Sequence, residues 1–413
     1  MTGSKQIIIR ATELFDGKGK RGLKYVIIEG DKVIDIINRK PRSIGFYYEG
    51  YVTPAFIDAH SHIGMCRHGE PSAEEEANDN SNQFLPLLNP LDSIYFDDHS
   101  FVEAVDFGVL YSCVVPGGGN LIGGKAMVIK NFARNRKDAL VKDYGYKMAL
   151  GYNPRSTTDW KGERPNSRMG LAALLAQKFD VLLRKKEKAE LAKENKLRAL
   201  IKEKEDKKIT EQEFGEKTSS IERKHILSFS LEEAALLEIL SGAKTVKCHV
   251  HKADDVLFLV ELAKKYGLRV TAEHLGDVFE QEIFDELARN NIPIVYGPLD
   301  SLAYEVELKH ASYKNAGLLM KSRALYGLMT DHPGVLVTFL REGLKFFLIQ
   351  GMGEAEAISL ITYKNAKILG IDDILGTIEP GKLASLIVWD KNPLHLAARP
   401  RLVLGEGKIL RKP

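Results

Sequence analysis

The middle of the chain alternates short apolar segments with helical ones, and this alternation constrains the fold more than any other feature. Strand-like runs cover residues 109–116, 245–251 and 269–274, and a helical stretch covers about residues 254–266. Strands that alternate with helices at this spacing predict a parallel sheet. A doubly wound sheet is the competing architecture. The glycines at residues 117–119, however, do not form the GxGxxG motif that opens a nucleotide-binding helix.

The two ends of the chain differ from this middle, because both are rich in short β-like segments separated by turns. The first such region is residues 6–52 and the second is residues 384–407. A length of 413 residues leaves room for a barrel of about 250 residues beside a smaller domain. We therefore expect the two ends to meet in one small β-domain.

Residues 170–225 form a separate segment that is rich in lysine, glutamate, leucine and alanine, with helical periodicity and mixed charges. The simplest interpretation is a charged, solvated helical hairpin inserted into the α/β region. The alternatives are an active-site lid and an oligomerisation arm, which would make the protein a homo-oligomer. The sequence does not distinguish between them.

The composition argues against several classes of partner. Lys and Arg (59) nearly balance Asp and Glu (56), so a net charge of +3 gives no electrostatic reason to expect a nucleic acid or a membrane. The three cysteines form no CxxC pair, which disfavours a disulfide scaffold and suits a reducing cytoplasm. We find no signal-peptide pattern and no run approaching the ~18 apolar residues of a membrane helix. We therefore expect a soluble, cytoplasmic protein.

The strongest chemical signal is the segment TPAFIDAHSHIG, residues 53–64, an apolar strand that ends in His60, Ser61 and His62. Side chains two residues apart on a strand point to the same side of the sheet. Both imidazoles therefore face one point, as two ligands of a single metal ion require. Because an HxH pair can also arise by chance, the ends of the later strands decide its meaning.

Three later strand ends carry residues of the same kind. One strand places His249 and His251 on one face, where His251 would reach the metal and His249 would lie one layer deeper. The next strand ends in His274, and the segment GLMTDHP reaches Asp331 before a proline. The carboxyl ends of barrel strands meet at the catalytic face. The predicted metal site therefore comprises His60, His62, His251, His274 and Asp331.

Neutral imidazoles and a carboxylate suit zinc, with iron, manganese and cobalt as alternatives. A divalent metal lowers the pKa of a bound water toward about 7 and so supplies hydroxide at neutral pH. A carboxylate beside it can take up the proton and pass it to a leaving nitrogen. We predict that Asp331 is this general base.

With these residues assembled, the chain resembles the amidohydrolase superfamily over nearly its whole length, and especially its imidazolonepropionase-related branch. The resemblance implies a distorted (β/α)8 TIM barrel with a composite β-sandwich formed by both termini. We place the barrel at residues 53–376, the sandwich at residues 1–52 and 377–413, and the helical insertion at residues 170–225. The matching stretches are TPAFIDAHSH, the glycine-rich loop PGGGNLIGGKAMVIK, ALGYNPR, HVHKADD, AEHLGD, GLMTDHP and GTIEPGKLASLIVWDKNPL.

The resemblance also implies the roles of the site residues and the type of reaction. Asp331 would be both a metal ligand and the general base. The expected reaction is hydrolysis of a C–N bond outside a peptide chain, in a small molecule such as a cyclic amide, an imidazolone-like ring, an N-acyl amino acid or a dipeptide. The implied metal ligands are His60, His62, His251, His274 and Asp331.

One departure from the relatives concerns the number of metal ions. They often bridge two metals with a glutamate in a GENP stretch, whereas this chain reads GYNP with Tyr152 at that position. A phenol with a pKa near 10 is a poor ligand. Carbamylation of Lys147 or Lys247 is another way to bridge, but Lys147 lies five residues before Tyr152 and is expected to be too deep. We therefore predict one metal, zinc, and do not expect a second.

Substrate recognition is less well specified. Arg155 and Arg168 flank the loop that follows Tyr152, where an arginine can clamp a substrate carboxylate through two hydrogen bonds. Both can equally be surface or structural residues. His249, Tyr152 and His332 are further candidates for binding the substrate or supporting the metal ligands.

Two rival functions use the same residues. A deaminase of a nitrogenous ring shares the single-metal set but normally needs a glutamate near His251, where this chain has Lys252, Ala253 and Asp254. A metal-binding pseudoenzyme is favoured by the missing glutamate of the GENP stretch and disfavoured by the retained Asp331. Metal content and turnover would separate these alternatives from the hydrolase.

Overall fold

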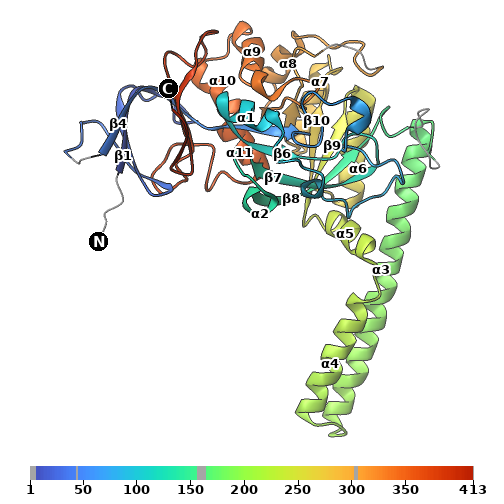
Figure 1. The fold of residues 1–413 in the computed structure, drawn as a ribbon. Helices are drawn as coiled ribbons and strands as arrows, with labels where there is room; N and C mark the ends of the chain where they lie inside the picture. Colours follow the sequence, from blue (N-terminus) through green and yellow to red (C-terminus); the bar gives the residue numbers. More distant parts are fainter. Residues whose placement is uncertain (1–5, 43–44, 156–163, 302–305, 413) are drawn as a thin grey trace.

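The computed structural model describes residues 6–42, 45–155, 164–301 and 306–412, and the strands of these residues form two sheets (Figure 1). The middle of the chain forms an eight-stranded sheet in the order β12-β11-β10-β9-β8-β7-β6-β5. Every residue of β5, β6, β9 and β10 is buried, as expected for strands that are covered on both faces. The strands are β5 (Phe56–Ser61), β6 (Val109–Val114), β7 (Ile122–Lys130), β8 (Leu140–Ala149), β9 (Thr245–Val250), β10 (Val270–His274), β11 (Ile294–Tyr296) and β12 (Tyr326–Leu328).

Strand β7 departs from the all-parallel pattern of a regular (β/α)8 barrel. It pairs antiparallel with both β6 and β8, whereas the remaining neighbours in the sheet pair in parallel. The sequence suggested a glycine-rich loop over PGGGNLIGGKAMVIK, but the second half of this stretch is β7. The reason is that residues 126–129 are apolar and all buried, so they add a strand to the sheet instead of crossing its surface.

The two edge strands, β5 and β12, lie close to each other and are joined by side chains. Asn365 donates from its amide to Ile57 O at 2.6 Å and to Leu328 O at 2.8 Å, so one side chain connects both edges. The carboxylate of Asp58 accepts hydrogen bonds from the backbone N of Thr330 at 3.1 Å and from its hydroxyl. We call this contact the seam. It brings the eight-stranded sheet close to a closed barrel, with the end of β5 beside the turn after β12.

The helices include a long pair that extends away from the barrel (Figure 1). Local signals set their ends: Ser167 caps α3, Thr210 and Glu213 form a capping box on α4, and Gly267 ends α6 with a φ of +67°. Within the described residues, no helix combines the length and apolar character that crossing a membrane requires. The helices are α1 (His99–Asp106), α2 (Arg136–Ala139), α3 (Arg168–Glu205), α4 (Glu211–Ile226), α5 (Leu231–Leu240), α6 (Ala253–Tyr266), α7 (Gln281–Arg289), α8 (Asn315–Lys321), α9 (Lys345–Ile349), α10 (Glu354–Leu360) and α11 (Tyr363–Leu369), with 3-10 turns η1 (Ser72–Glu74), η2 (Pro90–Asp92), η3 (Val337–Phe339) and η4 (Glu342–Leu344).

The seven-stranded sheet combines strands from both ends of the chain in the order β15-β14-β13-β4-β1-β2-β3. It has its own apolar core, and β13 pairs antiparallel with β4, which leads directly into β5 of the barrel. The folding of this sheet into two sandwich layers, and the domain boundaries at residues 52 and 377, stay predictions. The strands are β1 (Gln6–Leu14), β2 (Lys24–Glu29), β3 (Lys32–Ile37), β4 (Gly45–Pro54), β13 (Leu386–Trp389), β14 (Pro400–Gly405) and β15 (Lys408–Arg411).

The seam leads to a prediction about stability. The substitution Asn365→Ala removes both amide hydrogen bonds and leaves two buried carbonyl groups without this donor, so we expect a loss of about 2–4 kcal/mol in unfolding free energy. Urea unfolding followed by circular dichroism would measure it. The control Asn195→Ala, on the exposed surface of α3, should change stability by less than about 0.5 kcal/mol. Equal midpoints for the two variants would contradict the role of Asn365.

Candidate metal centre

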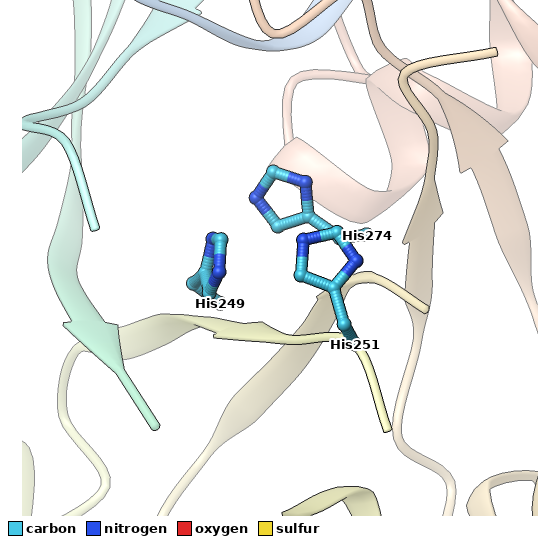
Figure 2. Close-up of side chains that lie close together, drawn as sticks. All are labelled: His249, His251 and His274. Carbon is cyan, nitrogen blue, oxygen red and sulfur yellow. The ribbon is translucent and has the colours of Figure 1, made fainter. Parts of the chain in front are cut away.

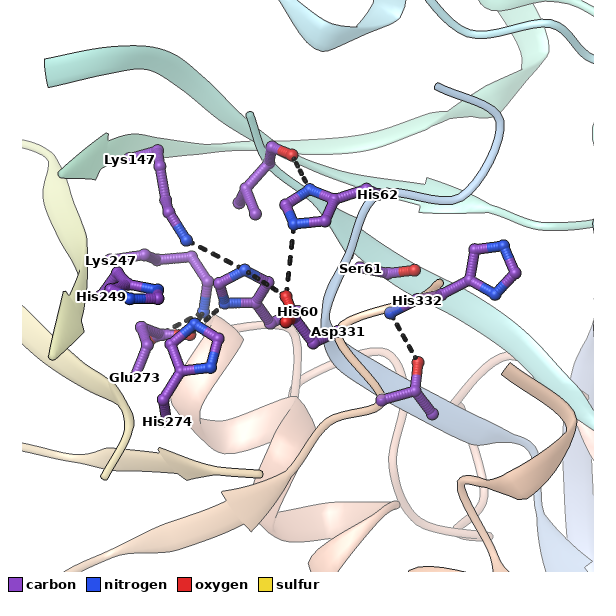
Figure 3. A network of polar contacts seen from close by, with 12 residues as sticks. His60, Ser61, His62, Lys147, Lys247, His249, Glu273, His274, Asp331 and His332 are labelled. Atoms are coloured by element: carbon purple, nitrogen blue, oxygen red, sulfur yellow. Dashed lines mark hydrogen bonds and ion pairs between the residues drawn. The ribbon is translucent and has the colours of Figure 1, made fainter. Parts of the chain in front are cut away.

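His60 and His62 lie at the end of β5, and each ring is held by its Nδ1 atom (Figure 3). His60 Nδ1 donates to a carboxylate oxygen of Glu273 at 2.9 Å, and His62 Nδ1 donates to Val115 O at 2.7 Å. The two Nε2 atoms are then directed toward Asp331, whose Oδ1 lies 3.3 Å from that of His60 and 3.2 Å from that of His62. Anchoring Nδ1 fixes the tautomer that leaves Nε2 free to bind a metal.

A second group consists of His249, His251 and His274 (Figure 2). The ring centroid of His249 lies 4.2 Å from that of His274, and the centroid of His251 lies 4.8 Å from each of the other two. His274 Nδ1 contacts Gly297 O at 3.1 Å, while its Nε2 is buried without a hydrogen-bond partner among the described residues. A buried nitrogen left in this state suits a metal ligand.

The two groups are neighbours, so the structure brings all five predicted site residues together. The ring centroids of His60 and His274 lie 5.0 Å apart, and the ligand atoms within each group lie within 4.8 Å of one another. The groups are His60, His62 and Asp331, and His249, His251 and His274.

Two of these residues reach the site through an unusual backbone conformation. His274 has a φ of +78° and Asp331 a φ of +53°, both in the left-handed region that residues other than glycine rarely adopt. On β10, regular alternation would turn the side chains of Glu273 and His274 to opposite faces. The left-handed conformation redirects His274, so that both residues take part in the site.

Lys147 is also part of the site. Its Nζ lies 3.0 Å from His60 Nε2, both residues are buried, and burial lowers the pKa of the lysine to about 8. The sequence suggested that Lys147 lies too deep. It does sit level with Lys247 in the register between β8 and β9, two residues below Ala149, but its long side chain reaches the histidines.

A buried network of polar and charged side chains, which was not predicted from the sequence, holds the ring of His60 in place. The carboxylate of Glu273 accepts hydrogen bonds from His60 and from the hydroxyl of Thr271, and lies 2.9 and 3.0 Å from the Lys247 ammonium. All four side chains are essentially inaccessible to solvent. The sequence does contain a signal for this network: Glu273, in the stretch AEHLGD, is an acid inside an apolar strand and therefore needs a buried partner.

Burial also sets the charge state of the histidines. It lowers the pKa values of His60, His249 and His274 well below the usual 6.5, and nearby positive groups add to the effect. Burial lowers the pKa of His251 to about 4. All four rings are therefore neutral at pH 7, which is the form that binds metals.

His249 lies in the wall of the site, two residues before His251 in the chain. Strand β9 ends at Val250, so His249 is the last inward-facing residue of the strand and His251 belongs to the following turn. His249 Nε2 contacts the amide of Asn153 at 3.1 Å and lies 4.0 Å from a carboxylate oxygen of Glu307. Neither residue was singled out from the sequence: Asn153 follows Tyr152 in the GYNP stretch, where only the tyrosine was considered, and Glu307 lies in a loop without a motif.

The remaining candidates have contacts outside the histidine groups. Tyr152 donates its backbone N–H to Glu307 at 3.0 Å, and its ring lies 4.8 Å from the Arg155 guanidinium. Arg168 pairs with the carboxylates of Asp254 and Asp255 on α6, at 3.4 and 3.2 Å. The ring of His332 points away from the other histidines, and its Nδ1 accepts from the Val337 backbone N at 3.3 Å (Figure 3).

Two cavities open onto the site. The front pocket has a volume of about 380 Å³, and the side pocket about 370 Å³. Asp331 lines both cavities. The front pocket is lined by His62, Lys147, Asn153, His249 and Asp331 among others, and the side pocket by His251, His274, Tyr296, Tyr313, Asp331 and Phe346 among others.

The chain is similar to known proteins both in its sequence and in its structure. Residues 181–410, more than half of the chain, match the Amidohydrolase family. A solved amidohydrolase from Thermotoga maritima MSB8 superposes with a TM-score of 0.84 at 27% identity, covering 98% of this chain and all of that one. The amidohydrolase tasK of Hapsidospora irregularis is 25% identical over 92% of this chain, and imidazolonepropionase of Legionella pneumophila (strain Lens) is 26% identical over 40%. The chain spans only 39% and 40% of the length of these two proteins.

The Glu273 network leads to a second stability prediction. The substitution Glu273→Gln leaves the buried Lys247 ammonium without its counter-charge, which should cost about 3–5 kcal/mol in unfolding free energy. Adding Lys247→Met removes the stranded charge, so the double variant should be more stable than Glu273→Gln alone. Urea unfolding at pH 7 would compare them. The control Glu203→Gln breaks the exposed pair with Lys217 and should cost less than about 1 kcal/mol. A double variant no more stable than the single one would contradict this account.

Proposed function

The chain belongs to the amidohydrolase family, and from this premise we propose that it is a metal-dependent hydrolase of carbon–nitrogen bonds outside peptide chains. The observation that carries the proposal is that His60 and His62 both direct Nε2 at one accessible carboxylate, that of Asp331, beside a second group of three buried histidines. Asp331 is 22% exposed at its side chain, whereas that of His60 is fully buried. A substrate can therefore reach Asp331 without displacing the histidines.

The donor set fits a divalent metal such as zinc, since it offers imidazole nitrogens and a carboxylate. His60, His62 and Asp331 would hold one ion, and His274 with His249 or His251 would hold another. A bound metal of this kind would activate water and polarise the carbonyl group next to the scissile bond.

Lys147 leads us to propose two ions in place of the single ion expected from sequence. Its amine faces His60 Nε2 in the space between the two histidine groups, and its lowered pKa leaves part of it neutral at neutral pH. A neutral amine attacks dissolved carbon dioxide, forms an N–C bond and loses a proton, giving a carbamate. The two oxygens of that carbamate would supply the bridging carboxylate that Tyr152 does not.

The residues of this chain then divide the work. Glu273 and Val115 hold the rings of His60 and His62 in one orientation through their Nδ1 atoms. Asp331 takes a proton from water and delivers it to the leaving nitrogen, because it is the carboxylate common to both pockets. The substrate is a small molecule; the classes to test are cyclic amides, imidazolone-like rings, N-acyl amino acids and dipeptides.

The carbamate leads to a prediction about metal content. Protein purified with zinc and bicarbonate should contain two zinc ions per chain, and isotopically labelled bicarbonate should give a carbamate signal in its NMR spectrum. In the variant Lys147→Met both the signal and one of the two ions should be lost, whereas the control Lys202→Met on exposed α3 should keep both. If the unmodified protein contained one zinc ion per chain and gave no carbamate signal, the two-ion proposal would be wrong and the single-ion site would stand.

Asp331 leads to a prediction about turnover. In a screen of the four substrate classes, Asp331→Asn should lower kcat by about 10²–10⁴-fold, because the amide cannot accept the proton. The control Asp206→Asn, at the end of α3, should leave kcat unchanged. If Asp331→Asn turned over its substrate at an undiminished rate, the proposed general base would be wrong.

A further inference from the structure

A third cavity lies beside the site and is larger than the other two. Its volume is about 620 Å³, compared with about 380 Å³ for the front pocket and about 370 Å³ for the side pocket. This volume lies within the range of pockets that enclose whole small molecules, roughly 300–1,000 Å³. We call it the distal pocket; its apolar wall comprises Leu299, Val335, Leu336, Phe339, Leu344 and Leu348.

The distal pocket adjoins both cavities that contain the site residues. Leu299 and Asp300 line the distal and side pockets together, and Gly334 lines the distal and front pockets together. Gly334 also donates its backbone N–H to Asp331 O at 2.8 Å. The distal pocket is therefore lined by a residue, Gly334, that is hydrogen-bonded to the proposed general base.

Gly334 lines both the front and the distal pockets and has no side chain to fill the space beside Asp331. A Cβ at this position would lie 3.1 Å from Asp331 O, 3.5 Å from Asp331 Oδ2 and 3.8 Å from Pro298 Cγ. A side chain here would therefore crowd the Asp331 carboxylate. The absence of a side chain here thus leaves room for a molecule that occupies both places.

The charged residues around the distal pocket are engaged with the protein itself. The Arg341 guanidinium donates to Glu342 at 2.8 Å and to two backbone carbonyls at 3.1 Å, and Lys345 pairs with Asp300. These groups need no charged ligand, so what the pocket offers is apolar surface. Phe339 is 50% exposed and Leu396, another lining residue, is 87% exposed. Exposed apolar side chains that gather at a cavity are typical of a binding site.

We propose that the distal pocket binds an extended apolar group of the substrate, such as a medium-length acyl chain or an aryl group, while the scissile bond lies at Asp331. This proposal rests on the proposed function, since it places the reacting bond in the metal centre. It narrows the substrates from small amides in general to those that carry an apolar group of substantial size.

Two alkyl hydroxamates separate the metal centre from the distal pocket, because both present the same metal-binding head. Acetohydroxamate tests the head alone, and octanohydroxamate adds an apolar chain. Isothermal titration of the zinc-loaded protein should give octanohydroxamate an affinity about one hundredfold or more above that of acetohydroxamate, since each buried methylene contributes roughly fourfold.

Variants of the exposed pocket residues locate the effect. Phe339→Glu and Leu396→Asp each introduce a carboxylate into the wall at positions that solvent already reaches. Each should lower the affinity for octanohydroxamate by tenfold or more and leave that for acetohydroxamate unchanged. The matched controls Phe107→Glu and Leu231→Asp, which are 43% and 77% exposed and do not line the pocket, should leave both affinities unchanged.

The outcomes distinguish a failure of the distal pocket from a failure of the metal centre. Equal affinities for the two hydroxamates in the unmodified protein would overturn the distal pocket and leave the metal centre standing. The proposal for the distal pocket would also be overturned if a pocket variant and its matched control lost affinity for octanohydroxamate to the same extent. If acetohydroxamate failed to bind the zinc-loaded protein, the metal centre itself, and with it the inference about the substrate, would be wrong.

Discussion

The seam between β5 and the turn after β12 is the constraint on which the site depends. Asp58 and Thr330, 272 residues apart in the chain, are joined there by two hydrogen bonds. Burial raises the pKa of Asp58 to about 7, and the bonds from Thr330 act in the opposite direction by stabilising its charged form. One consequence is that the Asp331 backbone N–H donates to His60 O at 3.0 Å, which fixes Asp331 beside the β5 histidines. The contact that nearly closes the sheet is thus also the contact that assembles the proposed catalytic group.

The buried charges beneath the site explain why its two lysines differ. Lys247 is neutralised by Glu273, which also orients His60, so this lysine has a structural role. Lys147 meets a histidine nitrogen at 3.0 Å where Lys247 meets a carboxylate. A positive charge at Lys147 would oppose a metal ion held by the same histidine. Conversion to a carbamate would reverse the sign of that charge, and the same electrostatics would then favour the ion.

Much of the site follows from strand periodicity, and the exceptions have identifiable causes. Alternation along β5 predicts that His60 and His62 point the same way, as they do, and apolar runs predict most of the strands. Alternation fails at His274, because a left-handed φ of +78° turns its side chain back toward Glu273. The reach of Lys147 depends on the length of its side chain as well as on its depth in the register. Strand β7 was missed because its glycines resemble a loop, while burial of the apolar residues after them decides the structure.

The left-handed residues also connect the stability of the fold to its chemistry. A residue other than glycine in this conformation costs of order 1–3 kcal/mol, and it persists only where its surroundings hold it. Asp331 is held by the bond from its backbone to His60, and His274 by the contact of its ring with Gly297 at 3.1 Å. In both cases the restraint comes from another strand end of the barrel. The site geometry is therefore stored in the near-closed barrel as a whole, and an isolated strand with its HxH motif could not reproduce it.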